Sequence, residues 1–380
     1  MPSSESTEPP DVIGDWARSG AFALTGRRAG PPMLPPGRAA SAARAHLGRL
    51  GLSIPGILGE RAAYAGLHRN GPLSCGGAFR MLPAPDGWLG LSLARSSDLD
   101  LVPALIEDET DDPWSAVAAW ASRTPVATAS ERLRLLGMPG GTVCDPAAGA
   151  RPGVTTTTLG QARPVRAPLI VDLTSLWAGP LCAHLLGLRG ARVVKVESRT
   201  RPDGARRGQA AFFELLHRGQ ESLTLDLDAD IAELKALIDS ADVVLEASRP
   251  RALLQLGIIA EDAVAAGTSW VSITARGRSH DAIGFGDDVA ASAGLVIWDD
   301  GAPLPVGDAL ADPLAGIAAA VAAHEALRSG EARLIDVSMV DVAAETLGAS
   351  PEHEVIRRDD AWWVEHDGGA VRIEAPQRRP

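Results

Sequence analysis

The strongest constraint on the fold is a regular alternation of short apolar runs with helical segments in the second half of the chain. The runs APLIVDL, ARVVKVE, SLTLDL, DVVLE and SWVSIT each suit one strand, and segments such as PLCAHLLGLRG and IAELKALIDSA lie between them. This alternation is typical of parallel strands that are covered on both faces and joined by right-handed crossovers. The sequence therefore predicts a Rossmann-like, doubly wound α/β sheet.

Changes in composition divide the chain into five segments. Residues 1–40 are rich in Ser, Glu, Pro and Gly and predict a flexible lead-in. Residues 41–144 combine helical patterns with the alternating strand DGWLGLSLA, which predicts a small α+β domain. The Gly-, Pro- and Thr-rich residues 145–166 predict a linker. Residues 167–350 form the predicted Rossmann-like domain, and residues 351–380 a hairpin tail that turns at the letters DGG.

Charge and cysteine usage exclude several classes of protein. The 36 basic and 48 acidic residues give a net charge of -12, which repels nucleic acid and anionic lipid. Cys75, Cys144 and Cys182 lie far apart and form no CxxC pair, which excludes a disulfide framework and a zinc site built from them. The polar, acidic start lacks a secretory signal, and no apolar run reaches 18 residues. We expect a cytoplasmic protein that binds neither nucleic acid nor membranes and holds no metal.

The first turn between strand and helix, TSLWAGPLCAHLLG, is the place where a doubly wound domain would bind a nucleotide. It lacks the GxGxxG pattern, because Gly179 stands alone before Pro180. NAD and FAD are therefore not expected, and we expect no permanently bound cofactor. The amides at the helix start could still receive a phosphate or a carbonyl group, although every helix start offers such amides.

The clearest helix is DPLAGIAAAVAAHEALRSG, whose apolar composition predicts burial. Asp312 is its predicted N-cap, Pro313 its first helical residue and Gly330 its stop. Taken alone, Asp312 is an ordinary capping residue that needs no chemistry.

Four motifs occur in order between residues 167 and 348: VDLTSLWAGPLCAHLLGLRGARVVKVE, FFELLHRGQESLTLDLD, ADVVLEASRPRALLQLGI and PVGDALADPLAGIAAAVAAHEAL. In order and spacing they resemble the family III CoA-transferases, also called the CaiB/BaiF family. The resemblance implies a Rossmann-like large domain, a smaller domain and a homodimer that can be interlocked. It also implies that the small-molecule partners are an acyl-CoA and a carboxylic acid, with coenzyme A as substrate.

The resemblance implies a catalytic role for Asp312, which matches the aspartate of the family's AD-LAG motif. In that family the carboxylate attacks the acyl-CoA thioester to form a mixed anhydride, and CoA thiolate converts the anhydride to an aspartyl-CoA thioester. An acceptor acid then takes over the CoA. A carboxylate is a competent covalent nucleophile, and a helix N-terminus would keep it ionised.

The CoA site also follows from the resemblance. Two groups of positions match the family's pantetheine-binding turn and its nucleotide-binding residues, respectively: Trp177, Ala178, Gly179 and Pro180; Lys195, Arg218, Ala247, Ser248 and Arg249. Arg218 and Arg249 could meet phosphates through charge-assisted hydrogen bonds. Glu221 and Gln255 stand where the family has cations, and Arg251 replaces a glycine. These departures weaken the attraction for a polyanionic nucleotide.

Two other functions fit the same resemblance. A non-catalytic acyl-CoA-binding or partner subunit would explain the missing cations. An α-methylacyl-CoA racemase needs two bases, but Phe285 stands where the racemase histidine would be, and His280 lies five residues earlier in an expected loop. A pair formed by Asp287 and Asp312 keeps the racemase alternative open.

The order of the domains departs from the family, because about 165 residues precede the first strand of the Rossmann-like segment. The segment GPLSCGGAFRMLPAPDGWLGLSLA resembles part of the small domain that normally follows the large one. We infer a permuted chain or the remnant of a tandem duplication, with an unrelated N-terminal domain as the alternative. A permuted chain would place Asp86, Trp88 and the loop around Cys75 near the acyl cleft or a dimer interface.

Overall fold

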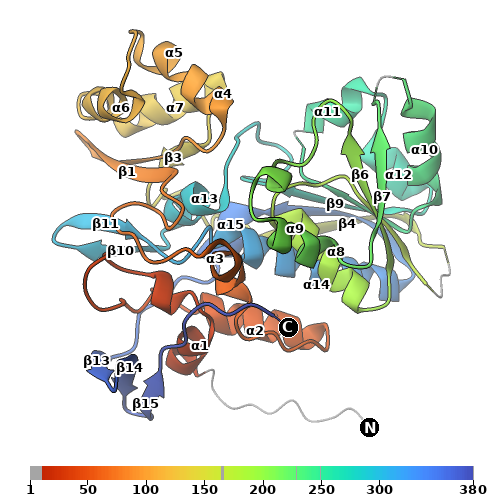
Figure 1. Ribbon diagram of the computed structural model, residues 1–380. Helices are drawn as coiled ribbons and strands as arrows, with labels where there is room; N and C mark the ends of the chain where they lie inside the picture. Colours follow the sequence, from red (N-terminus) through yellow and green to blue (C-terminus); the bar gives the residue numbers. More distant parts are fainter. Residues whose placement is uncertain (1–10, 164–166, 228, 249, 380) are drawn as a thin grey trace.

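In the part of the chain that the structure describes, the largest sheet has seven strands and lies on the right in Figure 1. The computed structural model describes residues 11–163, 167–227, 229–248 and 250–379. The strand order is β4-β12-β9-β8-β5-β6-β7, and every neighbouring pair is parallel except β12 with β4. The strands are β4 Val154–Gln161, β5 Leu169–Asp172, β6 Arg192–Ser198, β7 Glu221–Leu225, β8 Val243–Glu246, β9 Ser269–Thr274 and β12 Glu331–Ser338. The predicted α/β fold with a mostly parallel sheet is confirmed.

Helices cover both faces of this sheet (Figure 1). On β5, Ile170 packs in one core with α8 Ala178–Leu188 and α14 Ala311–Ser329, and Val171 packs in a second core with α10 Ile231–Ser240 and α12 Ala260–Ala265. Successive side chains of a strand point to opposite faces, so runs buried on both faces are apolar throughout. The other helices of this region are η3 Gly204–Arg207, α9 Ala210–His217, α11 Pro250–Gln255, α13 Gly286–Ala293 and α15 Met339–Ala344.

The segment predicted as a flexible lead-in is ordered from residue 11, which corrects that prediction for residues 11–40; residues 1–10 lie outside the described part of the chain. Trp16 and Phe22 are fully buried in the core that also contains α14. Proline and glycine in this segment shape turns between short elements instead of keeping the backbone mobile. These elements are α1 Val12–Arg18, η1 Phe22–Leu24, α2 Ala39–Arg49, η2 Ile57–Gly59 and α3 Glu60–Ala65.

Residues 79–143 form a smaller unit with a core of its own, and a second cluster joins Phe79, Met81 and Val143 to Ala291 and Val296. Its antiparallel sheet has the order β1-β2-β3, and Leu89 and Leu91 are buried beneath its helices. The predicted domain of residues 41–144 therefore spans two cores, because its first part packs with α14 and not with this sheet. The elements are β1 Phe79–Ala84, β2 Gly87–Ser92, α4 Ser96–Asp100, α5 Val102–Ile106, α6 Pro113–Ala121, α7 Val126–Leu136 and β3 Gly140–Thr142.

The predicted linker of residues 145–166 contains strand β4, which is a correction to that prediction; residues 164–166 lie outside the described structure. The run Thr155–Thr158 lacks apolar periodicity, but β-branched residues favour strands, and β4 occupies the sheet edge beside β12. The tail forms the expected hairpin, β14 Ala361–His366 with β15 Gly369–Arg372, and adds β13 Glu354–Arg358. A separate hairpin pairs β10 Val296–Asp299 with β11 Ala302–Pro305. No helix in the described ranges is both long enough and apolar enough to span a bilayer.

Candidate active site

The candidate site lies where the strand order of the sheet reverses. From β5 the chain continues to β6 and β7 on one side, whereas β8, β9 and β12 follow on the other. This is the order of doubly wound nucleotide-binding sheets, whose ligands bind beyond the carboxyl ends of the strands at the reversal. The turn before α8 follows β5, and Ala247 and Ser248 follow β8, so these predicted site residues share that edge.

The turn that ends at Trp177 is closely packed. Leu176 adopts a left-handed backbone with φ of 70°, an uncommon conformation for a side chain of its size. A Cβ atom at Gly179 would lie 2.1 Å from the hydroxyl of Thr174, so only glycine fits there. The Trp177 ring is buried edge-on to Phe212 at 5.6 Å, and its indole N–H has no hydrogen-bond partner among the described residues. An orphaned buried donor of this kind marks a place where a ligand could bind.

Helices α8 and α14 bring this turn close to Asp312. A Cβ atom at Gly316 would lie 2.5 Å from the carbonyl oxygen of Ala178, which shows how closely the two backbones approach. Gly316 follows Asp312 by one helical turn and lies on the same face of α14. The structure therefore places the first turns of α8 and α14, which carry Trp177–Pro180 and Asp312, beside each other.

Asp312 is not the N-cap of its helix, which corrects the sequence-based prediction. Helix α14 begins at Ala311 with Leu310 as the N-cap, and no side chain caps it. The Asp312 carboxylate instead accepts a hydrogen bond from the backbone N–H of Gly286, at the start of α13. A Cβ atom at Gly286 would lie 2.6 Å from Oδ2 of Asp312, so glycine permits this approach. Ala309, just before the helix, has a left-handed φ of 45°.

Other carboxyl groups surround Asp312 and change its proton affinity. Burial, opposed by Arg61 and reinforced by Asp287, raises the pKa of Asp312 to about 7. Burial and the charge of Asp308 raise the pKa of Asp287 to about 6, and burial raises the pKa of Asp288 to about 7. Desolvation therefore opposes the ionisation that a helix N-terminus would favour, and Asp312 titrates near neutral pH.

One guanidinium group faces these carboxyl groups. Arg61, on α3, donates from Nε to Oδ2 of Asp308 at 3.0 Å and from Nη2 to Oδ1, and the Asp308 side chain is fully buried. The Arg61 guanidinium also lies 5.4 Å from the centre of the Trp177 ring. Arg61 thus contacts both helix starts that frame the candidate site.

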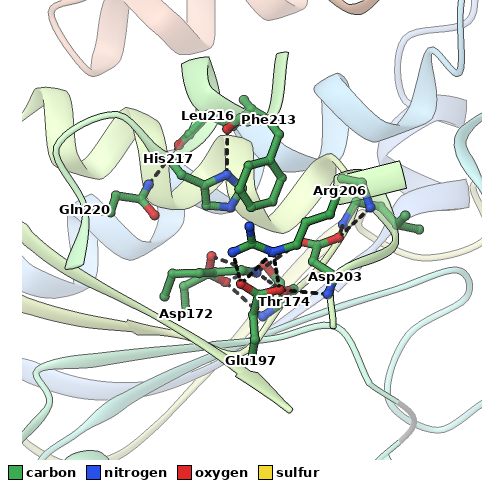
Figure 2. Close-up of polar contacts among 12 residues, drawn as sticks. Asp172, Thr174, Glu197, Asp203, Arg206, Phe213, Leu216, His217 and Gln220 are labelled. Carbon is green, nitrogen blue, oxygen red and sulfur yellow. Dashed lines mark hydrogen bonds and ion pairs between the residues drawn. The ribbon is translucent and has the colours of Figure 1, made fainter. Parts of the chain in front are cut away.

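Lys195 does not face solvent, contrary to a simple role as a phosphate-binding cation. Its side chain is 2% exposed, and its ammonium lies 3.5 Å from Asp172 and 3.3 Å from Asp203 and donates to the carbonyl of Thr174. Figure 2 shows the aspartates of this cluster beneath α9, with Arg206 bridging to Glu197. Hydrogen bonds from Arg206 lower the pKa of Glu197 to about 2. In this structure Lys195 supports the turn after β5 through its hydrogen bond to the carbonyl of Thr174.

The remaining predicted CoA contacts differ in their surroundings. Arg218 caps the end of α9 and is exposed, whereas Arg249 lies outside the described residues. The Ser248 hydroxyl donates to buried Glu246 at 2.9 Å. Glu221, the anion that replaces a family cation, forms an ion pair with Arg192, Oε1 to Nε, at 2.6 Å. Its charge is therefore compensated locally, although the pair is exposed.

The residues considered for a racemase do not place a histidine beside Asp312. Phe285 is the N-cap of α13 and packs beneath the guanidinium of Arg95 at 5.4 Å, and His280 is exposed in a loop. Asp287 does lie close enough to Asp312 for each to affect the other's charge, and its carboxylate accepts the N–H of Ala309 at 2.8 Å.

The N-terminal residues named with the permutation hypothesis lie in different places. Cys75 donates to the carbonyl of Gly307 at 3.1 Å, beside the carboxyl cluster. Burial and the charges of that cluster raise the pKa of its thiol. Asp86 instead accepts the N–H of Val126 at the start of α7, and Trp88 lies edge-on to Trp298 at 6.5 Å.

The sequence analysis missed Arg61, Asp288, Asp308 and the two close-contact glycines Gly286 and Gly316. The doubled aspartate of GDD and the aspartate of VGDA were local signals for the acidic residues. Arg61 carried no such signal, because it precedes its partner by 247 residues.

Comparison with known proteins places these motifs in a family. The succinyl-CoA:D-citramalate CoA-transferase of Chloroflexus aurantiacus is 29% identical over 215 residues, 51% of this chain and 54% of that protein. A probable fatty acyl-CoA transferase of Mycobacterium tuberculosis is 33% identical over 211 residues, 49% and 53% of the two chains. A solved structure of a hypothetical protein from M. tuberculosis has a TM-score of 0.47 at 30% identity, covering 55% of this chain and 65% of that one. The chain thus spans about half the length of the curated relatives it matches. The profile of CoA-transferase family III matches residues 168–361, half of the chain, and the protein belongs to this family.

Proposed function

We propose that the protein moves CoA from an acyl-CoA donor to a carboxylic acid, with Asp312 as the nucleophile. The observation that carries this proposal is the position of the Asp312 carboxylate. It does not cap its own helix, it is only partly buried, and it lies one helical turn from the residue that contacts the Trp177 turn.

The chemistry follows from a carboxylate placed beside a thioester. Ionised Asp312 attacks the thioester carbonyl, the C–S bond breaks, and a mixed anhydride and CoA thiolate result. The thiolate attacks the aspartyl carbonyl and releases the donor acid as a carboxylate. The acceptor carboxylate attacks the aspartyl-CoA thioester to form a second anhydride, and CoA thiolate then yields the new acyl-CoA and restores Asp312. The first attack requires deprotonated Asp312, so its rate should increase with pH through about 7.

The sheet edge supports a site for CoA at the Trp177–Pro180 turn. Its orphaned indole N–H and the amides at the start of α8 are donors for the pantetheine arm. Exposed Arg218 is a suitable contact for a phosphate group. We assign Lys195 to support of the turn, and Ala247 and Ser248 to the neighbouring rim.

We propose that the active form is a homodimer whose second subunit completes the cleft. A cavity of about 350 Å³ is lined by Arg49, His324, Glu325, Arg328 and Ser329, and a smaller one by Glu246, Leu253, Leu254, Ile258, Ala260, Trp270 and Arg278. Asp312 lines neither of these two cavities, so we propose that the second subunit supplies the rest of the cleft beside Asp312. Light scattering during gel filtration tests this: a monomer that still acylates Asp312 would contradict it.

Relatives suggest which donors to test. Two of them are named as a succinyl-CoA:mesaconate CoA-transferase and an acetyl-CoA:oxalate CoA-transferase. We would incubate the protein with succinyl-CoA or acetyl-CoA, trap with hydroxylamine and map the product by mass spectrometry. A hydroxamate at Asp312 that is absent in Asp312→Asn supports the proposal. Tight CoA binding without an adduct or turnover would identify a non-catalytic subunit.

The racemase alternative rests on the pair formed by Asp287 and Asp312, two carboxyl groups that titrate near neutral pH. Exchange of the α-hydrogen of a 2-methylacyl-CoA for deuterium would support it. The absence of exchange in a preparation that acylates Asp312 would exclude it.

The proposal of a permuted chain concerns residues before 168. It is supported by the contact of the Cys75 loop with Gly307, which places this loop at the carboxyl cluster. A circularly permuted variant that begins near residue 167 and rejoins the present ends should retain the Asp312 adduct. A variant that folds but loses the adduct would favour an unrelated N-terminal domain.

A further inference from the structure

Arg61 joins two parts of the site that the family motifs treat separately. It lies on α3, outside the segment 168–361 that matches the family. Its two hydrogen bonds hold Asp308, four residues before Asp312, and its guanidinium stacks on the ring of Trp177, at the start of α8.

The helix that carries Arg61 is itself held on the candidate site. Tyr64, one turn later on α3, packs against Phe212 at 5.9 Å, and Phe212 packs in turn against Trp177. Glu60 at the start of α3 is buried and accepts two hydrogen bonds from Arg379 of the C-terminal tail, one of them from Nη2 at 2.8 Å. These contacts fix α3 over the Trp177 turn, so the position of Arg61 is determined by packing on both sides.

The charges that face Asp312 come from several elements. Asp287 and Asp288 lie on α13, Asp308 lies in the loop before α14, and Arg61 lies on α3. The thiol of Cys75 faces the same cluster from the N-terminal segment. Among these groups Arg61 alone carries positive charge. Its charge therefore lowers the pKa of Asp312, whereas burial and the neighbouring carboxylates raise it.

We propose that Arg61 is a positioning residue for the reaction at Asp312: it ties the loop that begins α14 to the Trp177 turn and holds the nucleophile beside the bound thioester. This inference rests on the proposed function. Its geometric part is the bidentate bond to Asp308 together with the stack on Trp177. Its electrostatic part is the charge that favours ionised Asp312.

Two variants separate these parts. Arg61→Lys keeps the charge but loses the paired hydrogen bonds and the planar stack. The double variant Arg61→Met/Asp308→Asn removes the charges together, because Arg61→Met alone would leave a buried, unpaired carboxylate and endanger folding. Arg44→Met is the matched control, since Arg44 also pairs with a buried carboxylate, Asp15, in the same N-terminal segment.

Two measurements are made on each full-length protein. The first is the rate at which succinyl-CoA yields the hydroxylamine-trapped adduct at Asp312. The second is the titration midpoint of the Asp312 carboxyl carbon, followed by ¹³C NMR of aspartate-labelled protein and assigned with Asp312→Asn. Thermal unfolding verifies that each variant is folded.

We expect Arg61→Lys to lower the adduct rate about tenfold without moving the midpoint, because geometry is lost and charge is kept. The double variant should lower the rate, and its midpoint should lie above that of Asp308→Asn alone, because the charge of Arg61 lowers the pKa of Asp312 whereas that of Asp308 raises it. Arg44→Met should change neither quantity. A folded Arg61→Lys protein with the wild-type rate would overturn the positioning role. This test does not depend on whether the double variant folds.

The two measurements keep this inference separate from the proposed function. Wild-type protein that forms no adduct with succinyl-CoA or acetyl-CoA would refute the proposed function, and the positioning role with it. An adduct in the wild type with unchanged rates in folded Arg61 variants would refute the positioning role alone. A midpoint in the folded double variant that equals that of Asp308→Asn would overturn the electrostatic part, because the two proteins differ only at Arg61.

Discussion

Asp312→Asn should make the protein inactive and, at alkaline pH, more stable. In the native protein the Asp312 carboxyl has a pKa of about 7, against an ordinary value of 3.8. Between these values the native protein keeps a proton that the unfolded chain has released. A group whose native pKa is raised in this way costs stability as pH increases, and the full cost is present above the native pKa. Asparagine has no carboxyl group to ionise, so the variant lacks this contribution to the loss of stability, although Asp287 and Asp288 still make theirs.

The magnitude follows from the shift. Each pH unit between about 5 and 7 removes about 1.4 kcal/mol of unfolding free energy, or about 3 kcal/mol in total. Contact of the half-buried carboxyl with solvent reduces this to about 1–2 kcal/mol. Asp312→Asn should therefore be more stable relative to wild type at about pH 8.5 than at about pH 5 by that amount.

Urea unfolding at both pH values, followed by circular dichroism, measures the difference. Asp262→Asn, an exposed aspartate on α12, controls for the loss of one negative charge. A destabilisation of Asp312→Asn that is equal at the two pH values would refute the reasoning, because it would show that the native carboxyl is ionised throughout or that its role is structural.

Three further variants test the packing and charge around the site. Gly316→Val should destabilise the protein by about 2–3 kcal/mol in urea unfolding, because its Cβ would lie 2.5 Å from the Ala178 carbonyl; a wild-type midpoint would contradict the close approach of α8 and α14. Lys195→Met should cost about 3–5 kcal/mol, since it leaves two buried aspartates without their cation, and unchanged stability would show that these ion pairs do not stabilise the fold. Glu197, whose pKa Arg206 lowers to about 2, contributes stability that is present above about pH 4.5 and is lost as pH falls through about 2, so the thermal midpoints of Glu197→Gln and wild type should converge in acid; a constant gap would argue against the pair.

The mostly parallel sheet could be predicted because it depends on local patterns. Runs such as DVVLE are apolar throughout because both faces of β8 are covered, and the intervening helices show their own periodicity. Strand β4 was missed for the same reason: its threonines lie at an exposed edge, so burial left no apolar pattern to detect. The ordered N-terminal segment was missed because Trp16 and Phe22 find their partners on α14, far along the chain.

Asp312 could be named from its motif, but its environment could not. The motif suggests an N-cap, and only the approach of Gly286 shows that the carboxylate serves another helix. Its proton affinity depends on burial, on Arg61 and on the carboxyl groups of Asp287 and Asp308, none of which the local pattern AD-LAG encodes. Lys195 is the converse case: the motif suggests a cation for the nucleotide, but the side chain is buried beside two aspartates.

The order of residues along this chain was enough to predict the parallel strands with their helices, the family and the candidate nucleophile, because strand and helix periodicity and short motifs are local properties. The tertiary structure determines which charged side chains lie close together. Arg61 reaches Asp308 across 247 residues, and desolvation at that meeting point decides the protonation of Asp312. Electrostatic energies depend on distance and solvent exposure, and both arise only when distant segments pack together.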